Sequence, residues 1–348
     1  MVAVSIQQVA TQVGVSKAAV SMALRDHPNI PEARRRQIKK VARELGYRPS
    51  LVAQTLASQK THTLGIVVPL VIGDTTYTPI FWAVERVARQ NGYSVIMCNT
   101  DLDLNVENAD FDLLYRRRVE GIIFVPGTRP NTDVEPIREL EARGIPVVVA
   151  SEKPLYESSF TTVFFDNETV SKEMTEHLIG LGHRRIAFFH IGLSEAKARW
   201  EGYRRGLEAH GIAYDDSLVF QTGETTVVDE KTYDSEKVVK FLSRPNRPTA
   251  IYAHTDMLAV KVLRTLGKMG LRVPQDIALV GFDDIFVSRH LLPALTTVHQ
   301  PAEEIGSRAA ELLFERINGQ RNDAEWPVHE RIASRLIIRE SCGSSLSK

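Results

Sequence analysis

Four polar side chains follow the ends of predicted strands, which is where parallel α/β sheets bind their ligands. Asp74 and Tyr77 lie in the loop after the first predicted strand, Asp101 follows the second, and Asp166 follows two phenylalanines of a later strand. Carboxylates and a phenol at these places suit hydrogen bonding to a small hydroxyl-bearing ligand. For Asp166 the alternative is a helix cap, because a helical pattern begins directly after it.

Motifs for catalysis and cofactor binding are missing. The sequence has no Gly-x-x-x-x-Gly-Lys-Ser/Thr, no Gly-x-Gly-x-x-Gly after a strand and no Gly-x-Ser-x-Gly. His190, His254 and His290 have no second ligand at a metal-like spacing, and His183 is interpreted as structural. We therefore expect no enzymatic activity, no cofactor and no metal site.

Beyond residue 60, apolar runs alternate with amphipathic helical patterns. One series of strands is predicted at 64–69, 94–98, 121–125 and 146–150, and a second at 162–165, 185–190, 218–220, 250–253 and 277–281. Helices are predicted near 79–91, 106–116, 133–143, 168–181, 197–210, 230–243, 256–269 and 302–317. This alternation predicts parallel sheets covered on both faces, and two series suggest two lobes with a ligand cleft between them.

The charge of the chain is uneven. Residues 1–60 contain ten basic and three acidic residues, a net charge of +7, which leaves −7 for the remainder because the whole chain is neutral. A basic segment on an acidic body indicates a polyanionic partner for the N-terminal part. The alternative is a solvated basic face.

The first fifty residues predict three short helices. Ser5 and Gln8 form a capping box, Gly14 ends the first helix, Ser16 caps the second and Asn29 caps the third. Two helices joined by a tight glycine turn make a helix-turn-helix, which places its second helix in the major groove of DNA.

The runs Val9–Ser21 (VATQVGVSKAAVS) and Glu44–Pro49 (ELGYRP) closely resemble the headpiece of the LacI/GalR family of bacterial transcription regulators. The resemblance continues to about Arg339. It implies a headpiece that binds operator DNA and a core that resembles periplasmic sugar-binding proteins.

By this resemblance, Lys17, Ala18 and Met22 occupy base-reading positions, and Ser16 and Ser21 donate to phosphates. Met22 stands where the family most often has arginine. Arginine binds guanine O6 and N7, whereas methionine offers only an apolar contact, so we expect an operator that differs from the common family half-site. The alternative is that Met22 packs on the first helix and reads nothing.

The resemblance also implies a hinge helix over residues 50–58 that orders on DNA. Ala53 matches the position where two copies touch, and Leu56 matches the apolar wedge inserted between base steps. Gln54 replaces the usual arginine of the family. The alternative for Leu56 is simple packing within the linker.

In the core, the resemblance implies that Arg199 holds ligand hydroxyls or carboxylates and that Asp283 is its carboxylate partner. Such a pair suits a small polyol, and the alternative is a structural ion pair. Two departures weaken a plain hexose as the ligand. The loop with Asp74 and Tyr77 lacks the family's Asn-Pro-Phe-Phe motif, and Thr255 replaces an asparagine that often touches sugar.

The predicted architecture is an N-terminal all-α helix-turn-helix headpiece followed by an α/β two-lobed, periplasmic-binding-protein-like core with parallel sheets. We expect residues 1–48 to form the headpiece, 49–60 the hinge helix and linker, 61–340 the ligand-binding and dimerisation domain, and 341–348 a tail. Within the core, the first lobe is expected at about 61–160 and 291–322, and the second at about 161–290 and 323–340.

The predicted function is a ligand-responsive repressor of carbohydrate-related genes that binds a pseudo-palindromic operator as a homodimer. Only two cysteines, no secretion signal and no membrane segment lead us to expect a cytoplasmic protein. The alternatives are a solute-binding protein without DNA function, or a regulator with a purine or sugar acid as effector. Whether the ligand is an inducer or a corepressor stays open.

Overall fold

The computed structural model describes residues 4–48, 60–69, 77–126, 134–151, 159–223, 233–320 and 325–344. The chain divides into two compact units, residues 1–61 and residues 62–348. None of the helices within the described ranges is long and apolar enough to cross a membrane.

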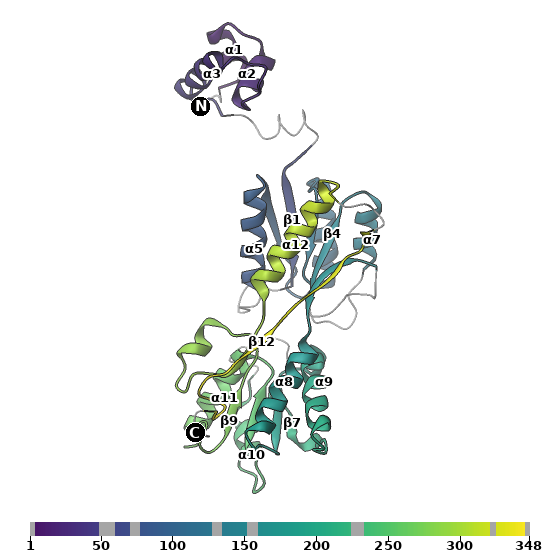
Figure 1. The fold of residues 1–348 in the computed structure, drawn as a ribbon, viewed down its shortest axis with the longest axis vertical. Coiled ribbons are helices and arrows are strands. Elements are labelled where there is room, and N and C mark those ends of the chain that lie inside the picture. The colour runs from purple at the N-terminus through teal and green to yellow at the C-terminus, as the bar shows by residue number, and fades with distance from the viewer. Residues whose placement is uncertain are drawn as a thin grey trace. The chain divides into compact units, whose positions relative to one another are not determined.

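The N-terminal unit consists of α1 (Ile6–Val13), α2 (Lys17–Leu24) and α3 (Glu32–Glu44) (Figure 1). One apolar cluster holds the three helices together, and its buried members are Val9, Ala10, Val13, Val20, Ala23, Ile38 and Ala42. Gly14 ends α1 with a φ of +72°, a conformation that glycine adopts without strain. The predicted helix-turn-helix is therefore present.

The predicted caps of this unit hold in two cases and fail in the third. The Gln8 side chain accepts a hydrogen bond from the Ser5 N–H at 2.8 Å, and Ser16 Oγ accepts from the Ala19 N–H at 3.1 Å. The prediction that Asn29 caps the third helix was wrong, because α3 begins only at Glu32, after Pro31. A cap at Asn29 would require a helical Ile30, which the following proline disfavours.

The first sheet of the core is parallel and has the strand order β11-β5-β4-β3-β1-β2. Its strands are β1 (Thr63–Val68), β2 (Ser94–Asn99), β3 (Ile122–Phe124), β4 (Val147–Ser151), β5 (Thr161–Phe165) and β11 (His329–Ile332). Helices α5 (Tyr77–Gln90) and α12 (Ala302–Ile317) pack together, and so do α6 (Leu104–Arg116) and α7 (Glu135–Ala142).

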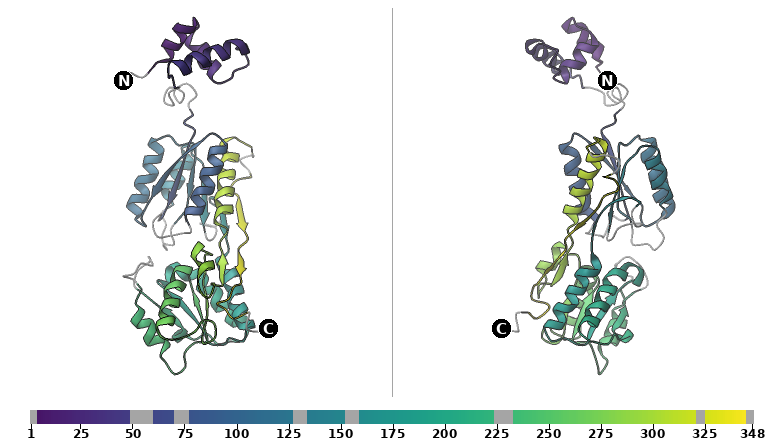
Figure 2. Two further views of the ribbon diagram at one scale, coloured as in Figure 1. Left: turned by 90° about the vertical axis from the view of Figure 1, so that its left-hand side faces the viewer. Right: turned by 45° about the vertical axis from the view of Figure 1, so that its right-hand side comes forward.

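Alternate residues of these strands face the two helix pairs. Ile123 and Val148 belong to the apolar cluster with α5 and α12, whereas Phe124 and Val149 belong to the cluster with α6 and α7. Figure 2 shows the helices on both faces of the sheet. Apolar residues on both faces explain why these strands appear in the sequence as continuous apolar runs.

The second sheet has the order β7-β6-β8-β9 and is also parallel. Its strands are β6 (Ile186–His190), β7 (Val219–Gln221), β8 (Ala250–Ala253) and β9 (Ala278–Val280). Helices α8 (Asn167–Gly180) and α9 (Leu193–Ala209) pack together, as do α10 (Ser235–Leu242) and α11 (Asp256–Lys268). A single turn, η1 (Asp216–Leu218), precedes β7.

Strand β10 (Thr297–His299) pairs antiparallel with β12 (Arg335–Ile337), and Val280 of β9 bridges to Thr296 beside it. The turn η2 (Phe286–His290) lies between β9 and β10. These segments extend the second sheet.

The boundaries expected from the sequence placed one strand, β5, in the wrong lobe. Strand β5 was assigned to the second lobe, but it pairs with β4 and β11 in the first sheet. Only residues 152–160 separate β4 from β5, fewer than a parallel crossover usually needs, which hid the pairing. The chain therefore passes between the sheets after Phe165, after β10 and between β11 and β12.

The expected tail is also part of the core where the structure describes it. Ser341 and Cys342 are buried, the Leu279 N–H donates to the Ser341 carbonyl at 2.9 Å, and Ser341 Oγ donates to the Leu279 carbonyl at 2.6 Å. Ser341 thus pairs with β9, and Cys342 beside it belongs to the apolar cluster of the core.

Candidate nucleic-acid interface and ligand site

Helix α2 presents the side chains expected to face DNA. Ser16, Lys17 and Ala18 are exposed, and Ser21 and Met22 are partly exposed. Val20 and Ala23 on the other side of the helix are buried against α1 and α3. The N-terminal turn of α2 is therefore open for contact with a polyanion.

The hydroxyl groups of Ser16, which caps α2, and of Ser21 on α2 remain able to donate a hydrogen bond. Ser16 Oγ accepts from the Ala19 N–H, and Ser21 Oγ accepts from Arg25 Nη2 at 3.0 Å. In both contacts the serine oxygen is the acceptor, so its own proton can go to a phosphate oxygen.

The arginines of α3 have partners within the headpiece. Arg34 Nη2 donates to the Val13 carbonyl at 3.3 Å, Arg35 Nη1 donates to the Asp26 carbonyl at 2.9 Å, and Arg36 pairs with Glu32. Arg34 thus ties α3 to the end of α1 in addition to contributing positive charge.

Four of the sequence-predicted site residues lie outside the described residues. They are Ala53, Gln54 and Leu56 of the linker and Asp74 of the first core loop.

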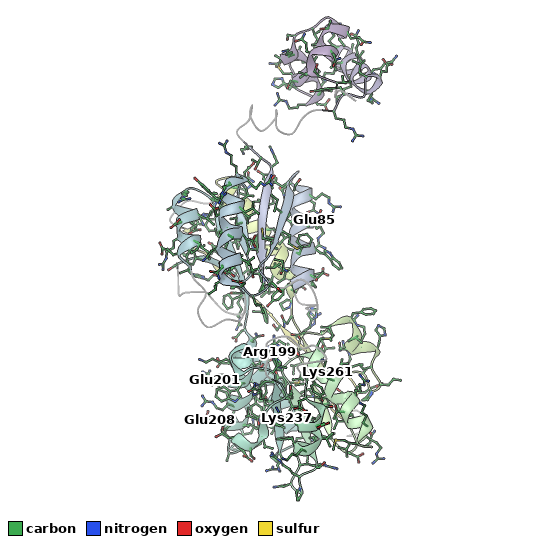
Figure 3. The ribbon with its side chains drawn as sticks, turned by 180° about the vertical axis from the view of Figure 1, so that it is seen from behind. Glu85, Arg199, Glu201, Glu208, Lys237 and Lys261 are labelled. Atoms are coloured by element: carbon green, nitrogen blue, oxygen red, sulfur yellow. The ribbon has the colours of Figure 1, made fainter. Side chains whose placement is uncertain are left out.

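The structure brings Arg199 and Asp283 together. Arg199 lies on α9 (Figure 3) and Asp283 follows β9, and Arg199 Nη1 is 3.4 Å from Asp283 Oδ1. The side chains are 7% and 9% exposed, so this is a buried ion pair. Since β9 and α9 belong to the same lobe, the carboxyl end of the second sheet carries both charges.

Neighbouring groups fix the two charges in place. The Arg199 guanidinium lies 3.9 Å above the ring of Phe282, and its Nη1 also donates to the His254 carbonyl. Gln300 Nε2 donates to Asp283 Oδ1. The arrangement combines a rigid cationic donor with a carboxylate acceptor, the two groups that a vicinal diol needs.

The other candidates have local roles in this structure. Asp166 caps α8 by accepting from the Thr169 N–H at 3.0 Å, and it is 3.4 Å from Arg331 of β11. Burial alone would raise the pKa of Asp166, but the hydrogen bonds from Thr169 and the charge of Arg331 hold the pKa below its usual value. The helix-cap alternative for Asp166 is therefore present in the structure.

In this structure three further candidates, Thr255, Asp101 and Tyr77, have roles other than contact with the ion pair. Thr255 caps α11 by accepting from the Leu258 N–H at 3.2 Å. Asp101 is exposed in a left-handed turn with a φ of +49°. Tyr77 begins α5 and packs partly buried against the apolar cluster.

Two polar residues beside the ion pair were not predicted as site residues. His254 is buried at the end of β8, and its Nδ1 has no hydrogen-bond partner within the described part of the chain. Burial and the nearby charge of Arg199 hold the pKa of His254 well below its usual value, so the ring is neutral. His254 follows the predicted strand 250–253, so examining the residue after every predicted strand would have found it. Gln300 follows β10, which the sequence analysis did not predict, and no local signal marked it.

No group of three or more metal-ligating side chains occurs among the residues that the structure describes.

Comparison with known proteins identifies the family of the chain. The family model "Bacterial regulatory proteins, lacI family" matches residues 5–50, and the model "Periplasmic binding protein-like domain" matches residues 175–342. Catabolite control protein A of Priestia megaterium is 34% identical over 328 residues, which cover 92% of this chain and 95% of that protein. The ribose operon repressor of Escherichia coli (strain K12) is 32% identical over 320 residues, covering 90% and 93%.

Among solved structures, the transcriptional regulator CelR–cellobiose complex has a TM-score of 0.70 and 28% sequence identity, covering 97% of this chain and 99% of that chain. A helix-turn-helix headpiece joined to a periplasmic-binding-protein-like core defines a class of DNA-binding, effector-responsive proteins. The chain belongs to the LacI family of bacterial regulatory proteins, and it is a transcription regulator rather than an enzyme.

Proposed function

We propose that this regulator is a repressor whose effector is a sugar or sugar derivative held by Arg199 and Asp283. The buried ion pair at the carboxyl end of the second sheet carries the proposal. A carboxylate fixed beside a guanidinium binds neighbouring hydroxyl groups in a defined orientation, which a purely apolar lobe cannot do. A relative named for a ribose operon and a similar structure that holds cellobiose support the same class of ligand.

The experiment is a thermal-shift screen of the full chain against D-ribose, cellobiose, hexoses, sugar phosphates, sugar acids and purines. A ligand present at 100 times its Kd stabilises the folded state by about 2.7 kcal/mol, which raises Tm measurably. A hit among the sugars supports the proposal, and its effect on operator binding distinguishes inducer from corepressor. A hit confined to purines would replace sugar by purine as the effector class.

Control of DNA binding is proposed to run through the two lobes. Ligand bound at the second lobe would close it on the first, changing the separation of the linkers, residues 49–60, and so the pairing of two hinge helices. Ala53, Gln54 and Leu56 would then meet the minor groove, with Leu56 as the wedge. The three connections between the sheets support a rigid-body mechanism, since they restrict the lobes to hinge motion.

Base reading is assigned to Lys17, Ala18 and Met22, and phosphate contact to Ser16 and Ser21. The Met22→Arg variant is expected to favour guanine at one position of each half-site by about 1–3 kcal/mol, because arginine supplies two donors to O6 and N7. Selection from random DNA with both proteins measures this preference. An unchanged selected sequence would show that Met22 does not face the bases.

A homodimer is proposed because a pseudo-palindromic operator requires two headpieces. Leu292 and Phe286, 91% and 76% exposed, are the two most exposed of the large apolar side chains described. Phe286 is the first residue of η2, and Leu292 follows the turn two residues after its end. Apolar groups gathered in one short segment are typical of an interface.

The Leu292→Asp variant is expected to convert dimers, of twice 39.0 kDa, into monomers, because a charge would be buried at the contact. Sedimentation velocity of the full chain measures the mass. The matched control is Val239→Asp, which places the same charge at an exposed position of α10 and should leave the dimer intact. Dimers that persist in the Leu292 variant would place the interface elsewhere.

A further inference from the structure

The loop that carries Asp283 has a backbone conformation rare for side chains other than glycine. Asp283 has a φ of +119° and Asp284 a φ of +54°. Such a conformation persists only where the surrounding structure holds it. The direction of the Asp283 carboxylate therefore depends on whatever fixes this loop.

Asp256, the first residue of α11, holds the loop on both sides of these two residues. Its N–H donates to the Phe282 carbonyl at 2.7 Å, and its Oδ2 accepts from the Ile285 N–H at 3.1 Å. Phe282 and Ile285 flank Asp283 and Asp284, so one residue clamps both ends of the left-handed segment.

Strand β10 adds a third contact through Thr297. Thr297 Oγ1 donates to Asp256 Oδ1 at 2.6 Å and accepts from the Asp284 N–H at 3.4 Å. Asp256 is fully buried, and a Cβ at Gly281 would lie 2.2 Å from Asp256 Oδ1. Gly281 thus makes room for the carboxyl group to reach the loop.

We propose that Asp256 is a positioning residue of the effector site, which fixes the loop so that Asp283 faces Arg199 and the ligand hydroxyls. The inference rests on the proposed function, in which Asp283 contacts the effector. Asp256 is not needed as the helix cap, because Thr255 caps α11. Its carboxyl group is directed instead at the loop and at Thr297.

The charge environment indicates which substitution preserves this role. Burial raises the pKa of Asp256 to about 7, with Asp284 acting in the same direction and Arg339 in the opposite one. His299 and Arg339 hydrogen-bond to Asp284 from β10 and from the segment after β12. Asparagine keeps both contacts: its Oδ1 can accept from the Ile285 N–H, and the Thr297 hydroxyl, which donates to Asp256, can rotate to accept from the asparagine Nδ2.

The test compares the full-length Asp256→Ala, Asp256→Asn and Thr297→Val variants with the unchanged protein. Hydrogen exchange of the peptide spanning 281–287 reports on the loop without any ligand, and calorimetric titration with D-ribose reports on the site. Thermal melting of each variant monitors the fold. We expect Asp256→Ala to speed exchange and weaken D-ribose binding about ten- to a hundredfold, Thr297→Val to do so less, and Asp256→Asn to remain near the unchanged protein.

Unaltered exchange in Asp256→Ala would overturn the positioning role, as would faster exchange with undiminished D-ribose affinity. If Asp256→Ala fails to fold, the same comparison is made with Thr297→Val, and unaltered exchange there overturns the proposal. If the unchanged protein does not bind D-ribose, that result counts against ribose as the effector, and the exchange data still decide the role of Asp256.

Discussion

Replacement of Arg199 by alanine is expected to abolish the effector response and to lower the free energy of unfolding of the core by about 3–5 kcal/mol. Arg199 Nη1 lies 3.4 Å from Asp283 Oδ1. The variant removes this cation and leaves the Asp283 carboxylate buried without its counter-charge. Operator binding without ligand should persist, because the headpiece forms a separate compact unit. Denaturant unfolding and operator titration, with and without an effector sugar, measure the two effects.

The matched control is Arg205→Ala on the same helix. Arg205 pairs with Glu168 at 2.6 Å, but its side chain is 62% exposed. Exposed ion pairs contribute about 0–1 kcal/mol, so this variant should keep both stability and response. A normal effector response in Arg199→Ala would show that the ligand site lies elsewhere.

Replacement of Val20 by aspartate is expected to reduce operator affinity more than about a hundredfold by unfolding the headpiece. Val20 is fully buried in the small cluster that joins α1, α2 and α3. An aspartate buried there would have no cationic partner, which raises the free energy of the folded headpiece. So small a core is only marginally stable, so the variant is expected to unfold it. Effector binding by residues 62–348 should remain. Fluorescence anisotropy with labelled operator measures the loss.

The control for added charge is Gln12→Asp, at an exposed position of α1. It introduces the same charge into the headpiece without burying it, and we expect a much smaller loss of affinity. Equal losses in the two variants would attribute the effect of Val20→Asp to charge repulsion instead of unfolding.

The sequence was most informative where periodicity and turn chemistry act locally. The first two helices of the headpiece, the glycine at position 14 and the Ser16 cap all follow from neighbours a few residues apart. Prediction failed at Asn29, where the restriction that Pro31 imposes on Ile30 outweighed the capping preference. It also failed for β5, because strand pairing is a long-range property that a local pattern does not encode.

For the candidate site too, part was predicted from the sequence and part was not. The resemblance pointed to Arg199 and Asp283, and the structure places them in contact. The contacts made by Asp256 escaped prediction, since they come from α11, the loop after β9, and β10. Only the tertiary fold brings those three segments together.

The discontinuous construction of the core has a consequence for its synthesis. Strand β5 acquires its outer neighbour β11 only after more than 160 further residues have been made, and β9 meets Ser341 near the end of the chain. Helix α12, which covers the first sheet, is also late. Neither lobe can be completed as it leaves the ribosome, so an edge strand and an apolar sheet face stay open during translation. Nascent chains of this regulator should therefore depend on chaperones until the last segment is released.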